Sequence, residues 1–279
     1  MRERSNQNSH LIKFHPSFYI VALGFVLTGY YLNLLIFTSL IIIHELGHFI
    51  AAKLCLAKVK KIMIYPYGGK TILEDYINRD IHQEIFIASS GVILQFIYYL
   101  FFCFLHQKYF IRTYTINLFT LYNSQIIFFN LLPIYPLDGG KILNRCLYLL
   151  FSYQIANILT IIFSLINIIL LFTLRIYQYN YSNLMIIFIL LYYLYLFYQK
   201  RKYLYQRFLL ERYLYHLNYT TLKIIPNLNK MYKNRSHLIY HHQKYQEEAE
   251  ALDQYFKKKN NALYNKKFFW YNIIILRSV

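Results

Sequence analysis

Long apolar stretches separated by short polar segments occupy the first 200 residues of the chain. A helix needs about 20 apolar residues to cross the hydrocarbon layer of a membrane, and by that measure the chain offers about six candidate spans. The pattern predicts an all-α polytopic membrane protein with a transmembrane domain over residues 1–200. The candidate spans lie near residues 16–31, 33–57, 84–106, 113–134, 153–175 and 182–199.

Composition and charge support this class and orient the chain. The 279 residues are 57% hydrophobic and 15% charged, a balance that a soluble domain of this length cannot hide from water. The formal net charge of +18 comes from basic residues between and after the apolar stretches, where they would meet anionic lipid headgroups. With six spans, segments 58–83 and 135–152 and the region after Lys200 share one side with the N-terminus. The positive-inside rule places both termini in the cytosol, and we expect no nucleic-acid partner.

Polar and charged residues become frequent after the last apolar stretch. Residues 201–215 are expected to form a linker, and residues 216–279 mix charge with short apolar runs at 222–225 and 268–276. This length is enough for a small module. We therefore expect a cytosolic C-terminal module over residues 216–279.

Carboxylates are almost absent from the apolar part of the chain. Glu45 is the only one within residues 4–73, and Asp138 is the only one within residues 85–210. Both fall in or beside predicted spans, where an ionised carboxylate costs several kcal/mol on insertion scales. A carboxylate in such a place usually has a partner or a function.

Glu45 lies within the pattern His44-Glu45-Leu46-Gly47-His48. On a helix, residues four apart share a face, so both imidazoles can reach one zinc ion while Glu45 contacts water at the metal. The same five-residue pattern also arises by chance in soluble helices, and an alternative interpretation is a helix that carries structural polar residues. Burial of two histidines and a glutamate in lipid favours the zinc interpretation.

A catalytic zinc usually takes three protein ligands, so a third is expected from elsewhere in the chain. The other deep carboxylate is Asp138, in a segment that Pro133 and Pro136 must interrupt and in which Gly139 and Gly140 permit close backbone approach. Irregular backbone at membrane depth is tolerated where it lines a protein cavity. The alternative is that Asp138 caps a following helix over residues 139–150.

Together, the His44 to His48 pattern and the segment 130–140 resemble the site-2 protease family of intramembrane zinc metalloproteases. The resemblance covers most of the chain and implies that His44, His48 and Asp138 ligate one Zn2+ while Glu45 acts as general base and later as proton donor. It also implies a short membrane-dipping loop after residues 59–65, although an ordinary turn is the alternative there. The residues that it implies for substrate binding are Asn130, Pro133, Pro136, Pro66, Gly68 and Gly69.

One departure concerns the third span. Members of the family commonly carry Gly-Pro-x-x-Asn there, whereas this chain has Gly91-Val-Ile-Leu-Gln95. Gln and Asn offer the same amide donors and acceptors on stems of different length. We expect Gln95 to stand in for the asparagine and contacts to the substrate or the loop to shift.

Length and span layout resemble the sporulation members of the family in particular. That resemblance implies a membrane-associated protein substrate, namely a pro-sigma factor, a membrane-anchored inhibitor, and a location in the mother-cell membrane around the forespore. It further implies that the C-terminal module is a degenerate CBS-like domain, with ATP binding and self-association into a homo-oligomer. The alternatives are a membrane zinc transporter and a catalytically inactive membrane scaffold.

Overall fold

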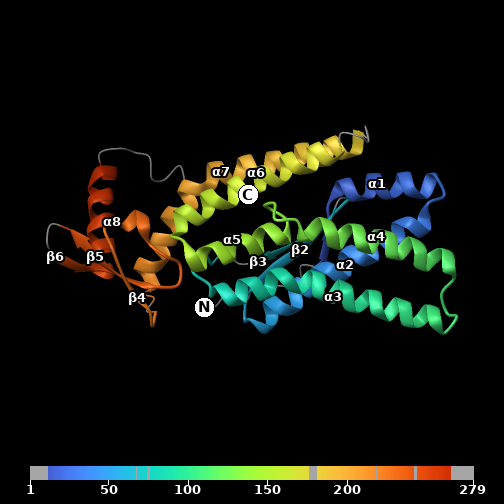
Figure 1. Cartoon of the computed structure of the whole chain (residues 1–279), viewed down its shortest axis with the longest axis horizontal. Coiled ribbons are helices and arrows are strands. Elements are labelled where there is room, and N and C mark those ends of the chain that lie inside the picture. The colour runs from blue at the N-terminus through green and yellow to red at the C-terminus, as the bar shows by residue number, and fades with distance from the viewer. Residues whose placement is uncertain are drawn as a thin grey trace, which may run out of the picture.

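The computed structural model describes residues 12–66, 68–73, 76–175, 181–215, 217, 219–241 and 244–264. Long helices form the body of the molecule, and a small unit of strands and one helix lies at one end of it (Figure 1). The helices are α1 Pro16–Leu27, α2 Tyr31–Leu54, α3 Ile81–Gln107, α4 Thr113–Leu131, α5 Asp138–Leu150, α6 Tyr153–Arg175, α7 Tyr181–Tyr215 and α8 Glu248–Tyr264. The strands are β1 Ile12–Phe14, β2 Val59–Tyr65, β3 Gly68–Leu73, β4 Leu222–Ile225, β5 Ser236–His241 and β6 Lys244–Glu247, with a short 3-10 helix at Leu228–Lys230.

Four helices in the described residues are long and apolar enough to cross a membrane: α2, α3, α6 and α7. The expected count of six is not confirmed. Helix α1 has 12 residues and so spans about 18 Å, which is shorter than a hydrocarbon layer of about 30 Å. It ends early because Gly29 takes a φ of +77°, a conformation that commonly terminates a helix. Helix α4 has 19 residues, but eight of them are Thr, Asn, Ser or Gln.

A three-stranded sheet packs against α2, so the expectation of an all-helical chain misses part of the fold. Strand β1 pairs in parallel with β2, and β2 pairs antiparallel with β3, placing Ile64 opposite Gly69 and Ile62 opposite Thr71. Ile62 and Ile64 are buried, and β-branched residues favour such half-covered strands. The expected membrane-dipping loop lies between β2 and β3, which pair as an antiparallel hairpin, and its entry into the membrane stays a prediction. Its residue Tyr67 lies outside the described residues, and β3 is an edge strand.

The chain between α4 and α5 is irregular, as the two prolines predict. Helix α4 ends at Leu131 and α5 begins at Asp138. The first turn of α5 lies tightly against this connection: a Cβ atom on Gly139 would sit 2.2 Å from the Leu131 carbonyl oxygen, and one on Gly140 would sit 2.3 Å from the Ile134 carbonyl carbon. Only glycine permits this approach, which fixes the position of Asp138.

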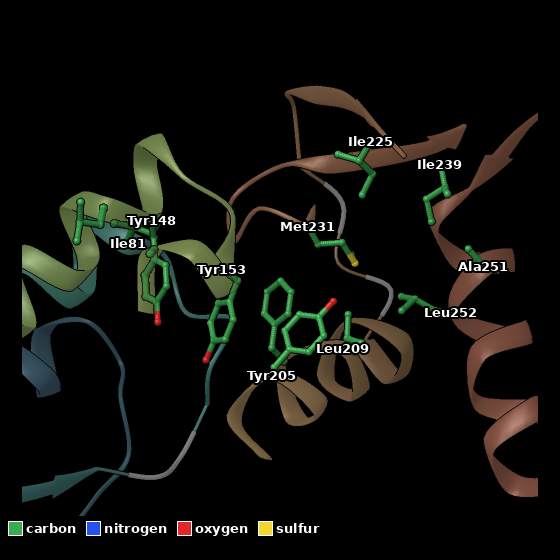
Figure 2. Close-up of a cluster of buried hydrophobic side chains, with 13 residues drawn as sticks. Ile81, Tyr148, Tyr153, Tyr205, Leu209, Ile225, Met231, Ile239, Ala251 and Leu252 are labelled. Carbon is green, nitrogen blue, oxygen red and sulfur yellow. The ribbon is translucent and has the colours of Figure 1, made fainter. Parts of the chain in front are cut away.

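The C-terminal module consists of a three-stranded sheet, in the order β4-β5-β6, and α8. The apolar run at 222–225 is β4, whereas the run at 268–276 lies outside the described residues. Residues 201–215, expected to be a linker, instead continue α7 without a break. Figure 2 shows one apolar cluster that joins Tyr148 and Tyr153 to Tyr205 of α7 and to Met231 and Leu252 of the module. The module therefore shares a core with the helical body.

Buried ion pairs cross the same boundary. Arg212 of α7 is 2% exposed and donates to both carboxylate oxygens of Glu248, at 2.5 and 3.0 Å. Lys233 of the module donates to Glu84 in the first turn of α3, and the same Glu84 oxygen lies 3.1 Å from Nε of Arg145 on α5. Burial lowers the pKa of Lys233 to about 8, against the opposing influence of Glu84. These contacts tie the module to α7 and α3, and Glu84 links α3 in turn to α5, the helix that begins at Asp138.

Candidate metal centre

One face of α2 carries His44, Glu45 and His48, as their spacing predicts. Their nearest ligand atoms lie within 4.8 Å of one another. Asp138, the first residue of α5, completes the group, and all four side chains are buried, with exposed fractions of 5%, 4%, 7% and 3% in chain order. The carboxylate of Asp138 contacts the histidines and makes no hydrogen bond that caps its own helix, so the capping interpretation is not needed.

Three candidate ligand atoms form a nearly equilateral triangle. Nε2 of His44 and Nε2 of His48 are 3.2 Å apart, and Oδ2 of Asp138 lies 2.9 Å from the first and 3.0 Å from the second. Zinc bonds of about 2.0–2.1 Å in a tetrahedral array separate neighbouring ligand atoms by about 3.3–3.4 Å. The triangle therefore fits one face of a zinc tetrahedron with small adjustments.

The hydrogen bonds of the two Nδ1 atoms indicate whether the Nε2 atoms of His44 and His48 carry a proton or a lone pair. Nδ1 of His48 lies 2.7 Å from the Ile87 carbonyl oxygen, which can only accept, so this nitrogen carries a proton. Nδ1 of His44 lies 3.0 Å from Oε1 of Gln95, with the same consequence. In the neutral rings, both Nε2 atoms then direct lone pairs at each other and at a carboxylate oxygen. Such an arrangement is repulsive unless a cation lies among the three atoms, and the donor set suits zinc.

Gln95 contacts the His44 ring, which the sequence did not reveal. It is fully buried on α3, and its Nε2 donates to Oδ1 of Asn123 at 3.0 Å, which leaves Oε1 free to accept from His44. That Gln95 stands in for the family asparagine, with shifted contacts to the substrate or the loop, stays a prediction. Gln95 stands out in the sequence by its place in the third span, but its contact with His44 depends on how α3 packs against α2.

Glu45 lies between the triangle and the edge strand β3. Thr71 of β3 donates its hydroxyl to Oε2 of Glu45 at 2.7 Å. A Cβ atom on Gly69 would lie 2.3 Å from Cγ of Glu45, so only glycine lets the strand approach this closely. The carboxylate is thus held beside the ligand triangle and next to an unpaired strand edge.

Comparisons with known proteins agree with this geometry. The profile of Peptidase family M50 matches residues 32–116, which include His44, Glu45 and His48. Stage IV sporulation protein FB of Bacillus subtilis is 36% identical over 225 residues, covering 77% of this chain and 75% of that protein. The chain belongs to peptidase family M50, the site-2 protease family. A zinc metalloprotease of Methanocaldococcus jannaschii is 33% identical over 128 residues, covering 44% of this chain and 36% of that protein.

The fold of this M50 peptidase is also found in a solved structure. The site-2 protease from Methanocaldococcus jannaschii superposes with a TM-score of 0.51 at 20% sequence identity, covering 66% of this chain and 88% of that chain. At this identity the match shows the fold alone. It supports the arrangement of the helices that carry the ligand triangle.

The residues expected to bind substrate in this M50 peptidase occupy different positions. Gly69 lies against Glu45, and Gly68 begins β3 with a φ of +153°. Pro66 directly follows β2, while Pro133 and Pro136 lie in the connection that leads to Asp138. The side-chain amide of Asn130 donates to the Ile126 carbonyl of its own helix, at 3.1 Å. Gly69 thus approaches Glu45, one of the four central residues, closely.

Proposed function

We propose that this M50 peptidase is an intramembrane zinc metalloendopeptidase. In this proposal His44, His48 and Asp138 hold one Zn2+, and Glu45 is the general base. The observation that carries the proposal is the convergence of three lone-pair atoms within 2.9–3.2 Å of one another beside a buried carboxylate. When bound, zinc would polarise water and the scissile carbonyl.

The residues of the chain then divide the work between orientation and proton transfer. Gln95 and the Ile87 carbonyl hold the two imidazoles in one tautomer, which keeps their Nε2 atoms available as ligands. Glu45 accepts a proton from the attacking water and later delivers it to the leaving nitrogen of the cut peptide. The Thr71 hydroxyl fixes the carboxylate for both transfers.

The substrate is proposed to bind as an extended strand. A peptide bond in a regular helix is shielded by its own hydrogen bonds and side chains, so the substrate segment must unwind before cleavage. The edge strand β3 offers backbone groups for such a segment within contact distance of Glu45. The residues proposed to line its path are Pro66, Gly68, Gly69, Asn130, Pro133 and Pro136.

The likeness to stage IV sporulation protein FB suggests a role in sporulation. We propose that the substrate is a membrane-associated pro-sigma factor and that the enzyme acts in the mother-cell membrane with both termini in the cytosol. The membrane-anchored inhibitor, a homo-oligomer, the CBS-like character of residues 216–279 and binding of ATP there stay predictions.

The alternatives are a membrane zinc transporter and an inactive scaffold. A transporter needs metal-ligating groups along a path through several spans, whereas the only such cluster among the described residues is the one at His44, Glu45 and His48. An inactive scaffold has no use for a general base, yet Glu45 is present and held by Thr71. Both observations favour the protease.

The deciding experiment is co-expression of the full chain with the sigma-factor precursor from the same genome. The wild type should shorten the precursor, and Glu45→Gln should abolish cleavage while still binding zinc. The matched control is Glu250→Gln, which changes an exposed carboxylate on α8 and should leave cleavage unchanged. Cleavage that persists in Glu45→Gln would refute the mechanism. Zinc stoichiometry measured on Asp138→Asn tests the third ligand separately.

A further inference from the structure

The Asp138 carboxylate has two oxygens, and they have different partners. Oδ2 faces both imidazoles, whereas Oδ1 accepts from Nζ of Lys141 at 2.8 Å. Asp138 is almost completely buried, but the Lys141 side chain is 42% exposed, so it reaches from the rim of the site to the carboxylate. The lysine lies one helical turn after Asp138, in the first turn of α5.

Helix electrostatics do not account for a lysine at this position. The N-terminus of a helix carries partial positive charge, which favours Asp138 and disfavours a cation in the same turn. An exposed pair at this spacing would contribute only a few tenths of a kcal/mol to the helix. The position of Lys141 is explained by its hydrogen bond to Oδ1 of Asp138, the carboxylate oxygen that does not contact the histidines.

We propose that Lys141 is a positioning residue that holds Asp138 as a one-oxygen ligand. This inference rests on the proposed zinc site. A carboxylate whose second oxygen is free can swing and bind a metal through both oxygens. With Oδ1 held by Lys141, the two imidazoles and Oδ2 provide three ligands and leave the fourth position for water. Lys141 thereby keeps the reactive position open without touching the substrate.

Two measurements on the purified full chain test the proposal: zinc affinity by competition with a chromophoric chelator, and the visible spectrum after loading with Co2+. Partners that orient metal ligands typically contribute 10–100-fold to metal affinity, so Lys141→Gln and Lys141→Met should bind zinc about 10-fold more weakly. A change from one-oxygen to two-oxygen ligation should also weaken the Co2+ absorption bands, because their intensity depends on coordination geometry. Lys141→Arg should restore both.

The matched control is Lys257→Gln, which breaks an exposed Asp253–Lys257 pair on α8, far along the chain from the site. It should leave affinity and spectrum unchanged. The ammonium group of Lys141 also repels zinc, so removing it would strengthen zinc binding if Lys141 did not orient Asp138. Equal or tighter zinc binding in Lys141→Gln therefore overturns the proposal, as does an unchanged Co2+ spectrum. A Lys141→Gln variant that melts at a lower temperature but binds metal normally also overturns the proposal, because Lys141 would then contribute to stability alone. A wild type that binds no zinc overturns the proposed function itself.

Discussion

At Gly91 the backbone of α3 lies against the rings of His44 and His48, the two histidines of the proposed zinc site. A Cβ atom added there would be 2.6 Å from Nε2 of His48 and 2.9 Å from Cε1 of His44. Neither ring can easily give way, because each is held through its Nδ1 atom. Gly91→Ala therefore adds one methyl group at the point where α2 and α3 meet over the site. We expect it to displace the histidines.

The size of the displacement follows from these distances. Relieving the shorter contact from 2.6 Å to the 3.4 Å of an ordinary van der Waals contact requires a movement of about 0.8 Å. Catalytic groups tolerate about 0.5 Å of error, and a misplacement of about 1 Å can lower activity about 100-fold. Alanine also raises helix propensity by about 1 kcal/mol relative to glycine, so the variant need not unfold. Loss of activity should thus occur without loss of the fold.

The assay is cleavage of a co-purified substrate in detergent or vesicles, together with zinc affinity and thermal unfolding of each variant. Gly91→Ala should cleave about 100-fold more slowly than the wild type. Gly24→Ala is the matched control, because it also lies in a helix and its added methyl group meets nothing within 4 Å. If Gly91→Ala cleaves within a few-fold of wild type, the histidine rings are not confined as the structure indicates.

Three further changes test other contacts. Gln95→Leu removes the acceptor that orients His44 and leaves buried polar atoms of His44 and Asn123 without this partner. Zinc affinity, measured by chelator competition, should therefore fall 10–100-fold. Thr71→Val removes the hydroxyl that holds Glu45, and kcat should fall about 10-fold with zinc affinity unchanged. Burial lowers the pKa of Lys233 to about 8 in the folded protein, against about 10.5 in the unfolded chain. Between these two pH values the unfolded chain therefore binds more protons than the folded protein. Docking of the module should therefore strengthen as the pH rises through that window. Limited proteolysis measures docking, and in Lys233→Met the resistance to proteolysis should not increase with pH.

Conservative variants separate these outcomes from general damage. Thr71→Ser keeps the hydroxyl and should retain most activity, and Gln95→Asn asks whether the shorter amide can still reach the histidine. A Thr71→Val enzyme with normal kcat would show that the hydroxyl does not position Glu45. Docking of Lys233→Met that strengthens with pH as much as in the wild type would assign the titration to another group.

Local patterns predicted the part of the site that one helix builds. The spacing of His44 and His48 places both rings on one face because helical periodicity is fixed by local geometry. Asp138 could be proposed because carboxylates are so costly in apolar segments that a single one there is informative. The contacts of Gln95 and Lys141 could not be predicted, since they depend on how α3 and α5 pack against α2.

Other differences have comparable physical reasons. The pairing of β1 with β2 joins residues about 50 positions apart, such as Ile12 and Ile62, so it cannot be predicted from a local sequence pattern. The early end of α1 was signalled by Gly29, which a count of apolar residues passes over. Residues 201–215 contain neither proline nor glycine, and this absence is the sign that α7 continues through them.

The shared core of the module and the helices also sets an order for biosynthesis. Ile81 at the start of α3 packs in the same cluster as Leu252 of α8, 171 positions later. At about 5–20 residues per second, a ribosome takes roughly 10–30 s to bridge that interval. During this time the start of α3 lacks the apolar side chains and the Lys233 ion pair that cover it in the finished protein. Synthesis of the last strands and α8 therefore completes the packing around the start of α3 well after that helix has been made.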